Sequence, residues 1–239
     1  MKRHLLSIII KAILISFILI ISLAYLIPIK SNIIAHIILS PIENKFRKKI
    51  EFNAPYIWIP GRIYLRDVSI IDKGGRLYYC KTFNIRYNLI GLMSIKKEFS
   101  FNLSDIKLYQ NVGLLDSVAN MLVISIMPDV KFEEIKGVLQ LRKDVVYIKD
   151  VYAYNEKMRI RGSGWINKDG LLNCDVNFSF SKDVTDMVPD AVKAVILKRE
   201  GEGWMGIALK VGGNYKKPSL HITSETLKLN IIEGLFRND

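Results

Sequence analysis

Residues 171–180, LLNCDVNFSF, alternate apolar and polar side chains along their whole length. Leu172, Cys174, Val176, Phe178 and Phe180 occupy one set of alternate positions, and polar residues occupy the other. A period of two is that of a β-strand with one buried and one wet face. Since antiparallel sheets commonly bury one face and leave the other in water, this stretch predicts an antiparallel sheet.

The same alternation of apolar and polar residues recurs before and after this stretch. Phe83, Ile85, Tyr87 and Leu89 alternate with polar residues, and Phe99, Phe101 and Leu103 do the same. Further strands are predicted at 56–59, 62–70, 137–141, 145–154, 158–165, 204–211 and 218–222, with a turn at 212–214. The fold class predicted is therefore mainly β (α+β).

A smaller part of the chain has helical spacing. Apolar residues recur every three or four positions in 112–127 and again in 184–196, where Pro189 divides the segment or starts its second half. The tail 226–236 could form a final helix. These segments predict two or three helices covering the sheet.

Residues 5–29, LLSIIIKAILISFILIISLAYLIPI, contain one charge, Lys11. As a helix they would reach roughly 37 Å, enough to cross the hydrocarbon core of a bilayer. We therefore predict an uncleaved transmembrane anchor within a first segment, 1–30. A cleaved signal peptide is the alternative, because Lys2-Arg3 precede the apolar run and Ser22-Leu23-Ala24 supply small residues. Basic residues flank both sides, so charge does not orient the segment.

Residues 31–50 carry apolar side chains at helical spacing, with Pro41 inside the pattern. We expect a juxtamembrane amphipathic helix, followed by one domain over 51–239. Four basic residues near its end are candidates for contact with the membrane surface: Lys45, Arg47, Lys48 and Lys49. The same helix could equally pack on the domain and leave these bases in water.

Charge and cysteine content limit the possible partners. Beyond residue 30 the chain holds 31 basic and 23 acidic residues, a net charge of +8. No basic tract interleaved with aromatics is present, so a nucleic-acid partner is not expected. Cys80 alternates with polar residues whereas Cys174 alternates with apolar ones, which places them on opposite faces and predicts two free thiols.

A short internal echo links two regions. Residues 64–68, YLRDV, reappear as 147–151, YIKDV. Two copies of so short a stretch can arise by chance from a common strand composition. The alternative, which we favour, is that one β-meander unit is used twice in a single sheet.

Three stretches resemble a known family. After the apolar segment, GRIYLRDVSIIDKGGRLYYCKTFNIRYNL at 61–89 looks like the N-terminal part of AsmA-like envelope proteins (AsmA/TamB type). GSGWINKDGLLNCDVNFSFS at 162–181 and GWMGIALKVGGNYKKPSLHI at 203–222 are similar to the C-terminal part of that family and of the related type II secretion protein N family. The matching motifs are strand-like alternating sequences with glycine, asparagine and proline at the turns.

The resemblance implies a single-pass inner-membrane protein with a periplasmic domain that acts in envelope lipid homeostasis, or as an accessory part of a secretion apparatus. A curved antiparallel sheet, an open groove or half-barrel, could shield phospholipid acyl chains, or its residues could form plain core. Envelope or secretion proteins, or a second copy, could bind at the sheet edges. The candidate lipid contacts are Phe83, Ile85, Tyr87, Leu89, Phe99, Phe101, Leu103, Val176, Phe178 and Phe180.

Catalysis has little support in the sequence. The three histidines have no metal-ligand spacing, and Ser163, in Gly162-Ser163-Gly164, lacks the flanks of a nucleophile elbow and suggests a bulge or turn. Asp67 and Asp150 are expected to cap strand ends or turns. We expect that the protein is not an enzyme and that it binds neither a cofactor nor a metal. A membrane-tethered hydrolase using Ser163 or His221 is the least favoured alternative.

Overall fold

The structure is a computed structural model. It describes residues 14–16, 28–33, 35–36, 39–40, 43, 48–58, 61–72, 75–87, 96–109, 113–124, 130–214, 217–223 and 228–231. Most of the predicted anchor lies outside these ranges. Within them, no helix combines the length and the apolar character needed to cross a membrane.

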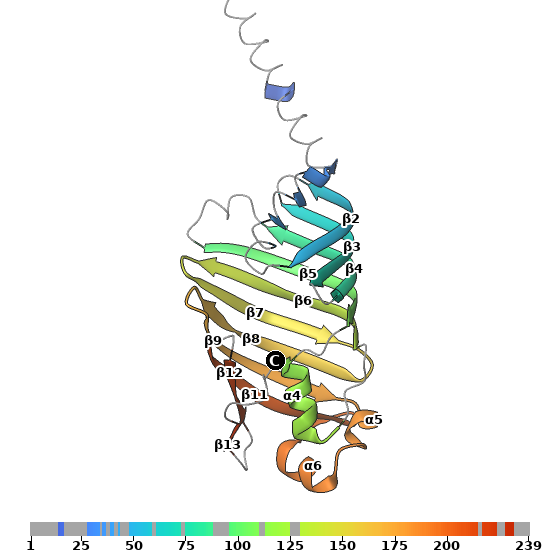
Figure 1. The fold of residues 1–239 in the computed structure, drawn as a ribbon, viewed down its shortest axis with the longest axis vertical. Coiled ribbons are helices and arrows are strands. Elements are labelled where there is room, and N and C mark those ends of the chain that lie inside the picture. The colour runs from blue at the N-terminus through green and yellow to red at the C-terminus, as the bar shows by residue number, and fades with distance from the viewer. Residues whose placement is uncertain are drawn as a thin grey trace, which may run out of the picture.

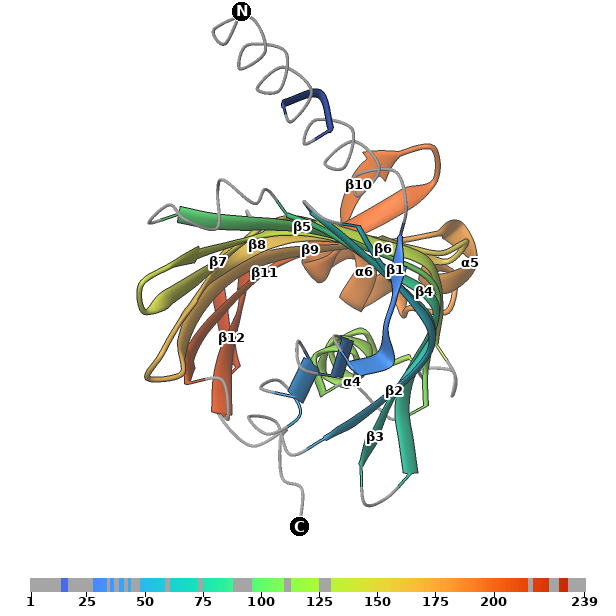
Figure 2. The ribbon, with the colours of Figure 1, turned by 90° about the horizontal axis from the view of Figure 1, so that it is seen from above.

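One antiparallel sheet of 13 strands dominates the described residues, as the alternation predicts. From β2 to β9 each strand pairs with the next in sequence, and β11, β12 and β13 continue the order, while β10 pairs only with β11. Figure 2 shows that the sheet curves into an open arc. The strands are β1 (Ile29–Lys30), β2 (Lys49–Trp58), β3 (Arg62–Asp72), β4 (Gly75–Tyr87), β5 (Lys96–Leu108), β6 (Lys131–Arg142), β7 (Val145–Tyr154), β8 (Met158–Asn167), β9 (Leu171–Phe180), β10 (Lys198–Gly201), β11 (Trp204–Asn214), β12 (Lys217–Thr223) and β13 (Lys228–Ile231).

Three helices follow the predicted positions. α4 (Gly113–Leu122) lies inside the arc, and its Leu115, Val118 and Leu122 belong to the buried core. α5 (Lys182–Thr185) and α6 (Asp190–Ile196) are separated at Pro189, which is the N-cap of α6, so the division expected there is confirmed. The proline stops one helix and starts the next because its fixed φ suits a first turn.

Four boundaries differ from those predicted. β2 begins at Lys49, so the end of the expected helix 31–50 belongs to the sheet, and the last residue of the apolar segment, Ile29, lies in β1. The 212–214 segment is not a turn but the end of β11, paired with β12. The described part of the expected C-terminal helix is β13. In each case pairing with a neighbouring strand outweighed local spacing, which carries no information about distant partners.

A recurrent backbone feature interrupts the strands. Asp67, Asp105 and Asp150 have φ angles of 50°, 49° and 49°, the left-handed region that few residues other than glycine tolerate. Each lies within the pattern Leu/Ile-x-Asp-Val/Ile, which is 65–68 in β3, 103–106 in β5 and 148–151 in β7. Both copies of the internal echo therefore bend at the same aspartate, and β5 holds a third example that the sequence comparison missed. The expectation that Asp67 and Asp150 cap strand ends or turns is wrong, because both lie within strands.

This bend changes which side chains face the core. Leu65 and Val68 are both buried although they are three positions apart, and the two residues between them are exposed. Ile148 and Val151 likewise share one face, and the β7 pairing shifts register between them. We call the positions of the three aspartates, Asp67 in β3, Asp105 in β5 and Asp150 in β7, the phase seam.

The seam also corrects the predicted face of Cys80. Cys80 pairs with Val68 and Ile106 beyond the seam, and it is a buried core residue with 5% of its surface exposed. Strict alternation counted along β4 from Phe83 predicts that Cys80 lies on the wet face, because a strict period of two ignores the seam. Both thiols are free, as expected. The reason is distance, because four strands separate β4 from β9 at about 4.8 Å per step.

The seam predicts a selective effect of β-branched substitution. Asp150→Val should lower the free energy of unfolding by about 1–2 kcal/mol, because a β-branched residue resists positive φ. The measurement is urea unfolding followed by circular dichroism. Asp175→Val, at an exposed mid-strand position of β9 without positive φ, is the matched control and should cost nothing. Equal stability of the two variants would contradict a strained seam.

Candidate functional site

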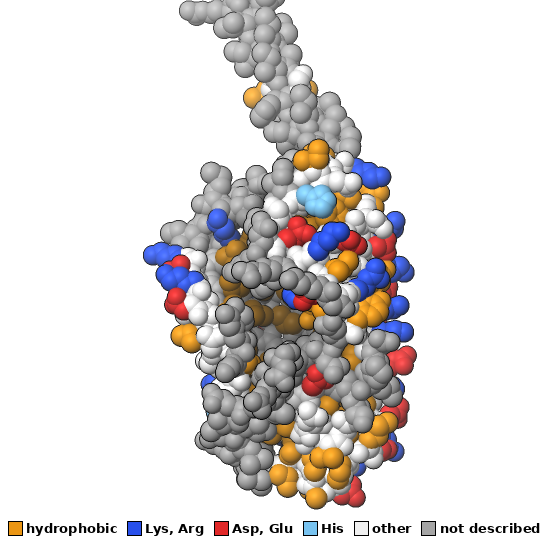
Figure 3. All heavy atoms as spheres, in the orientation of Figure 1, with side chains coloured by type: hydrophobic (Ala, Val, Ile, Leu, Met, Phe, Trp, Pro, Cys, Tyr) orange, Lys and Arg blue, Asp and Glu red, His pale blue; other side chains and the backbone are white. Residues whose placement is uncertain are grey.

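The concave face holds an apolar groove of about 940 Å³. Figure 3 shows hydrophobic side chains on the floor of the hollow between the two sides of the sheet. Strands β3 to β9 supply the lining, which places residues from distant parts of the chain side by side. The described lining residues are Ile63, Phe83, Ile85, Tyr87, Phe99, Phe101, Leu103, Leu139, Ile148, Val151, Ile160, Gly162, Ser163, Cys174 and Val176.

Seven of the ten predicted lipid-contact residues line this groove. They are Phe83, Ile85, Tyr87, Phe99, Phe101, Leu103 and Val176. Phe178 and Phe180 do not line the groove: they are buried, with 0% and 5% of their surfaces exposed, and their stacked ring centres are 6.3 Å apart. Phe180 lines a separate cavity, described below. Leu89 lies outside the described residues. The sequence identified the concave face but could not separate its open part from its covered part.

Packing against α4 explains part of that separation. On one side of the seam, Ile106 and Phe132 pack with Leu115 and Val118 of α4 in the buried core. Most groove residues are only partly buried, although Ile63 is a buried core residue, and several pack against that core. Val151 lines the groove although it follows the seam position Asp150 in β7. α4 covers part of the concave face, Ala35 and Leu39 from the helical residues between β1 and β2 belong to the same buried core, and the groove lies beside this covered part.

Two glycines shape the groove floor. Gly137 pairs with Phe101, and a Cβ added to Gly137 would come within 3.0 Å of the Phe101 ring, so the ring lies over bare backbone. Gly162 lies between Val151 and Val176 on the neighbouring strands. A Cβ at Gly162 would meet its nearest atom at an ordinary 3.5 Å. The missing side chain at Gly162 therefore deepens the groove without being required by the backbone. Of the bulge or turn expected at Ser163, the turn is wrong, since Gly162-Ser163-Gly164 is strand in β8, but Ser163 does lie opposite the register shift between Ile148 and Val151 of β7.

The groove lining can do little chemistry. None of its described residues carries a formal charge, and burial raises the pKa of the Cys174 thiol, which lowers the fraction present as thiolate. Such a lining has no general acid or base suited to neutral pH. What it offers a ligand is a surface that removes hydrocarbon from water.

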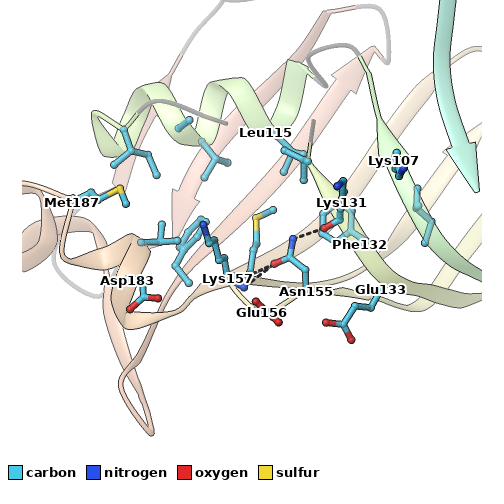
Figure 4. A pocket seen from close by; sticks show the side chains of 18 of the residues that line it. Lys107, Leu115, Lys131, Phe132, Glu133, Asn155, Glu156, Lys157, Asp183 and Met187 are labelled. Atoms are coloured by element: carbon cyan, nitrogen blue, oxygen red, sulfur yellow. Dashed lines mark hydrogen bonds between the residues drawn. The ribbon is translucent and has the colours of Figure 1, made fainter. Parts of the chain in front are cut away.

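A second cavity, of about 680 Å³, lies under α4 and α5. Figure 4 shows the Asn155 side chain at its rim: Asn155 Nδ2 donates to the backbone carbonyl of Lys131 (2.6 Å), and Asn155 Oδ1 accepts from the backbone N–H of Met158 (2.6 Å). Its interior is apolar, but its described lining mixes three lysines with four carboxylates. The sequence did not indicate this cavity, because α4 meets strands that are distant in the chain.

The remaining candidates for chemistry are far apart. In the cross-strand row Ser163–Asp175–Lys210–His221, Ser163 and His221 are separated by three strand spacings, about 14 Å. A nucleophile and its base must lie within hydrogen-bond reach, so this pair does not form a hydrolase site. The described residues contain no cluster of three or more His, Cys, Asp or Glu able to hold a metal ion.

The predicted membrane-surface lysines have acidic partners. Lys48 forms an ion pair with Asp72, and Lys49 with Glu51 at 2.7 Å. The Glu51 partner raises the pKa of Lys49, so the lysine stays charged, but part of its charge is balanced. Lys45 and Arg47 lie outside the described residues.

Comparison with known proteins adds no relative. No protein-family model, no curated protein and no solved structure matches this chain. The resemblance to AsmA-like proteins therefore remains a prediction from the sequence.

The two cysteines provide a direct test of the groove. Maleimide should modify Cys174, which lines the groove, and leave Cys80 unmodified in the folded protein, because burial raises the pKa of Cys80 to about 12. At pH 8 about one Cys80 thiol in ten thousand would be ionised. Mass spectrometry of tryptic peptides gives the sites, and both thiols should react in urea. Rapid labelling of Cys80 in the native state would contradict the buried position.

Proposed function

We propose that this chain is a non-enzymatic, membrane-anchored protein that shields lipid acyl chains in its concave groove, as the resemblance to AsmA-like envelope proteins implies. The observation that carries the proposal is the uncharged groove of about 940 Å³, left open beside a helix-covered core. The proposed setting is the inner membrane, with one N-terminal span, a juxtamembrane amphipathic helix and the sheet in the periplasm.

The groove has the properties of a hydrocarbon site. Its volume falls near the upper end of the range of about 300–1,000 Å³ usual for small-molecule pockets. Filling it would remove apolar surface from water, worth about 25 cal/mol for each Å². The lining provides no described charged group for a headgroup, so the polar end of a lipid would remain in solvent while its chains occupy the groove.

The start of the sheet supports a position next to the membrane. β1 holds the last residue of the predicted span, Ile29, and pairs directly with β2. Little chain therefore separates the proposed anchor from the sheet. The strands in sequence, about 4.8 Å apart, extend roughly 50–60 Å, which would carry a lipid only part of the way across an envelope.

The open ends of the sheet favour a second candidate role. The strand order has two ends, at β1 and β13, rather than closing on itself, and an uncovered strand edge can pair with another chain. An accessory component of a secretion apparatus, or a self-associating subunit, would use these edges. Proximity labelling that recovers secretion machinery and no lipid would favour this role.

Filling the groove tests the lipid role. Gly162→Phe should place a ring on the groove floor and lower co-purified phospholipid several-fold, measured by native mass spectrometry of the full chain extracted in detergent. Asn177→Phe is the matched control, because Asn177 is an exposed position next to groove-lining Val176 on β9, on the other face.

Two results would count against acyl-chain binding. The first is wild-type protein that carries no phospholipid in any detergent. The second is equal lipid content in Gly162→Phe and Asn177→Phe, with both variants showing the wild-type circular dichroism spectrum.

A further inference from the structure

We infer that the outer face of β2, β3 and β4, at the end of the sheet next to β1, docks onto the surface of an anionic bilayer. The surface consists of Tyr56, Trp58, Arg62, Tyr64, Arg66 and Arg86, and we call it the aromatic–arginine patch. The inference rests on the proposed anchor but not on lipid in the groove.

Alternation places the patch on the face opposite the groove. Ile57 and Ile63 are buried, and Ile85 lines the groove. Their sequence neighbours Tyr56, Trp58, Arg62, Tyr64 and Arg86 therefore point to the outer face. All are at least partly exposed.

The side chains of the patch contact one another. The Arg62 guanidinium lies over the Trp58 ring, 5.1 Å from its centre, and Arg62 Nε donates to the side-chain oxygen Oδ1 of Asn84 at 3.1 Å. The Tyr56 ring is 6.2 Å from Trp58 and 6.3 Å from Tyr64. These contacts hold flat, amphipathic rings and a guanidinium together at one surface.

The charge of the patch is positive. Arg62 and Arg86 are directly opposite each other in the β3–β4 pairing, and like charges in such a position repel. Arg66 Nε donates to the Tyr64 hydroxyl at 3.4 Å. The acid next to it, Asp67, accepts a hydrogen bond from the Tyr79 hydroxyl at 2.9 Å. A phosphate-bearing surface would relieve the repulsion between Arg62 and Arg86.

The position of the patch identifies the partner. In the β1–β2 pairing, Ile29 lies opposite Ile57 and Lys30 opposite Tyr56. The chain leaving the predicted span is thus hydrogen-bonded to the strand that carries Tyr56 and Trp58. Figure 1 shows β2, β3 and β4 together at one end of the sheet, so the patch lies within about 10 Å of that strand. Tryptophan and tyrosine favour the headgroup region, and arginine binds phosphate through its planar fork.

The chain contains its own control for this chemistry. On the outer face near the other end of the sheet, Arg159 lies 3.9 Å from the centre of the Trp204 ring. The same pair of residue types occurs there without the neighbouring membrane exit. Docking at β2–β4 should therefore depend on place and not on arginine–tryptophan contact alone.

Single-tryptophan variants of the full chain test the docking surface. One variant keeps Trp58 (Trp165→Phe, Trp204→Phe), and the matched variant keeps Trp204 (Trp58→Phe, Trp165→Phe). Each is reconstituted in vesicles of phosphatidylglycerol and phosphatidylcholine with brominated acyl chains, whose bromines quench nearby tryptophan fluorescence. We expect the quenching of Trp58 to be at least threefold greater than that of Trp204, and to fall when Arg62 and Arg86 are both changed to Gln.

Each outcome is decisive. Equal quenching of Trp58 and Trp204 overturns the inference, as would be expected if the patch met an acidic protein instead. Failure of the chain to enter the vesicles overturns both the anchor and the docking surface. Strong quenching of Trp58 in a protein that carries no groove lipid would keep the docking surface and remove the acyl-chain role.

Discussion

The architecture depends on one backbone constraint, an aspartate held near φ +50° inside β3, β5 and β7. A regular strand would carry its apolar side chains along one unbroken face. The bend resets the alternation, so two successive outward residues separate inward residues such as Leu65 and Val68. Aspartate suits this position because its short polar side chain tolerates the left-handed region better than most.

The concave face has two environments, which the seam separates in β5 but not in β7, where Val151 follows Asp150 and lines the groove. Beyond the seam, α4 closes the core over Ile106 and Phe132, and side chains such as Phe178 are fully buried. Before it, Phe83, Phe99 and Phe101 are only partly buried and line the groove. One sheet therefore provides both the stability of a packed core and an apolar surface for a ligand.

Alternation alone was sufficient to predict a mainly antiparallel sheet and to collect seven groove residues in advance. It failed where structure depends on partners remote in sequence. Cys80 was placed on the wrong face because its phase is set by Val68 and Ile106 across the seam. The tail 226–236 was expected to be a helix, but its described residues, 228–231, pair with β12. The recurring Leu/Ile-x-Asp-Val/Ile pattern was visible in the sequence, but only the φ angles show that it marks a bend.

In the proposed arrangement, β1 ties the sheet to the membrane exit, and the groove starts at β3 on the face opposite the aromatic–arginine patch. The most direct measurement is photo-crosslinking in the producing cells. A benzophenone amino acid would replace either Phe101, in the groove, or Asn102, the next residue on the other face. The account predicts phospholipid adducts at position 101 and few at 102. Adducts of equal yield at both positions, or protein adducts alone at 101, would contradict it.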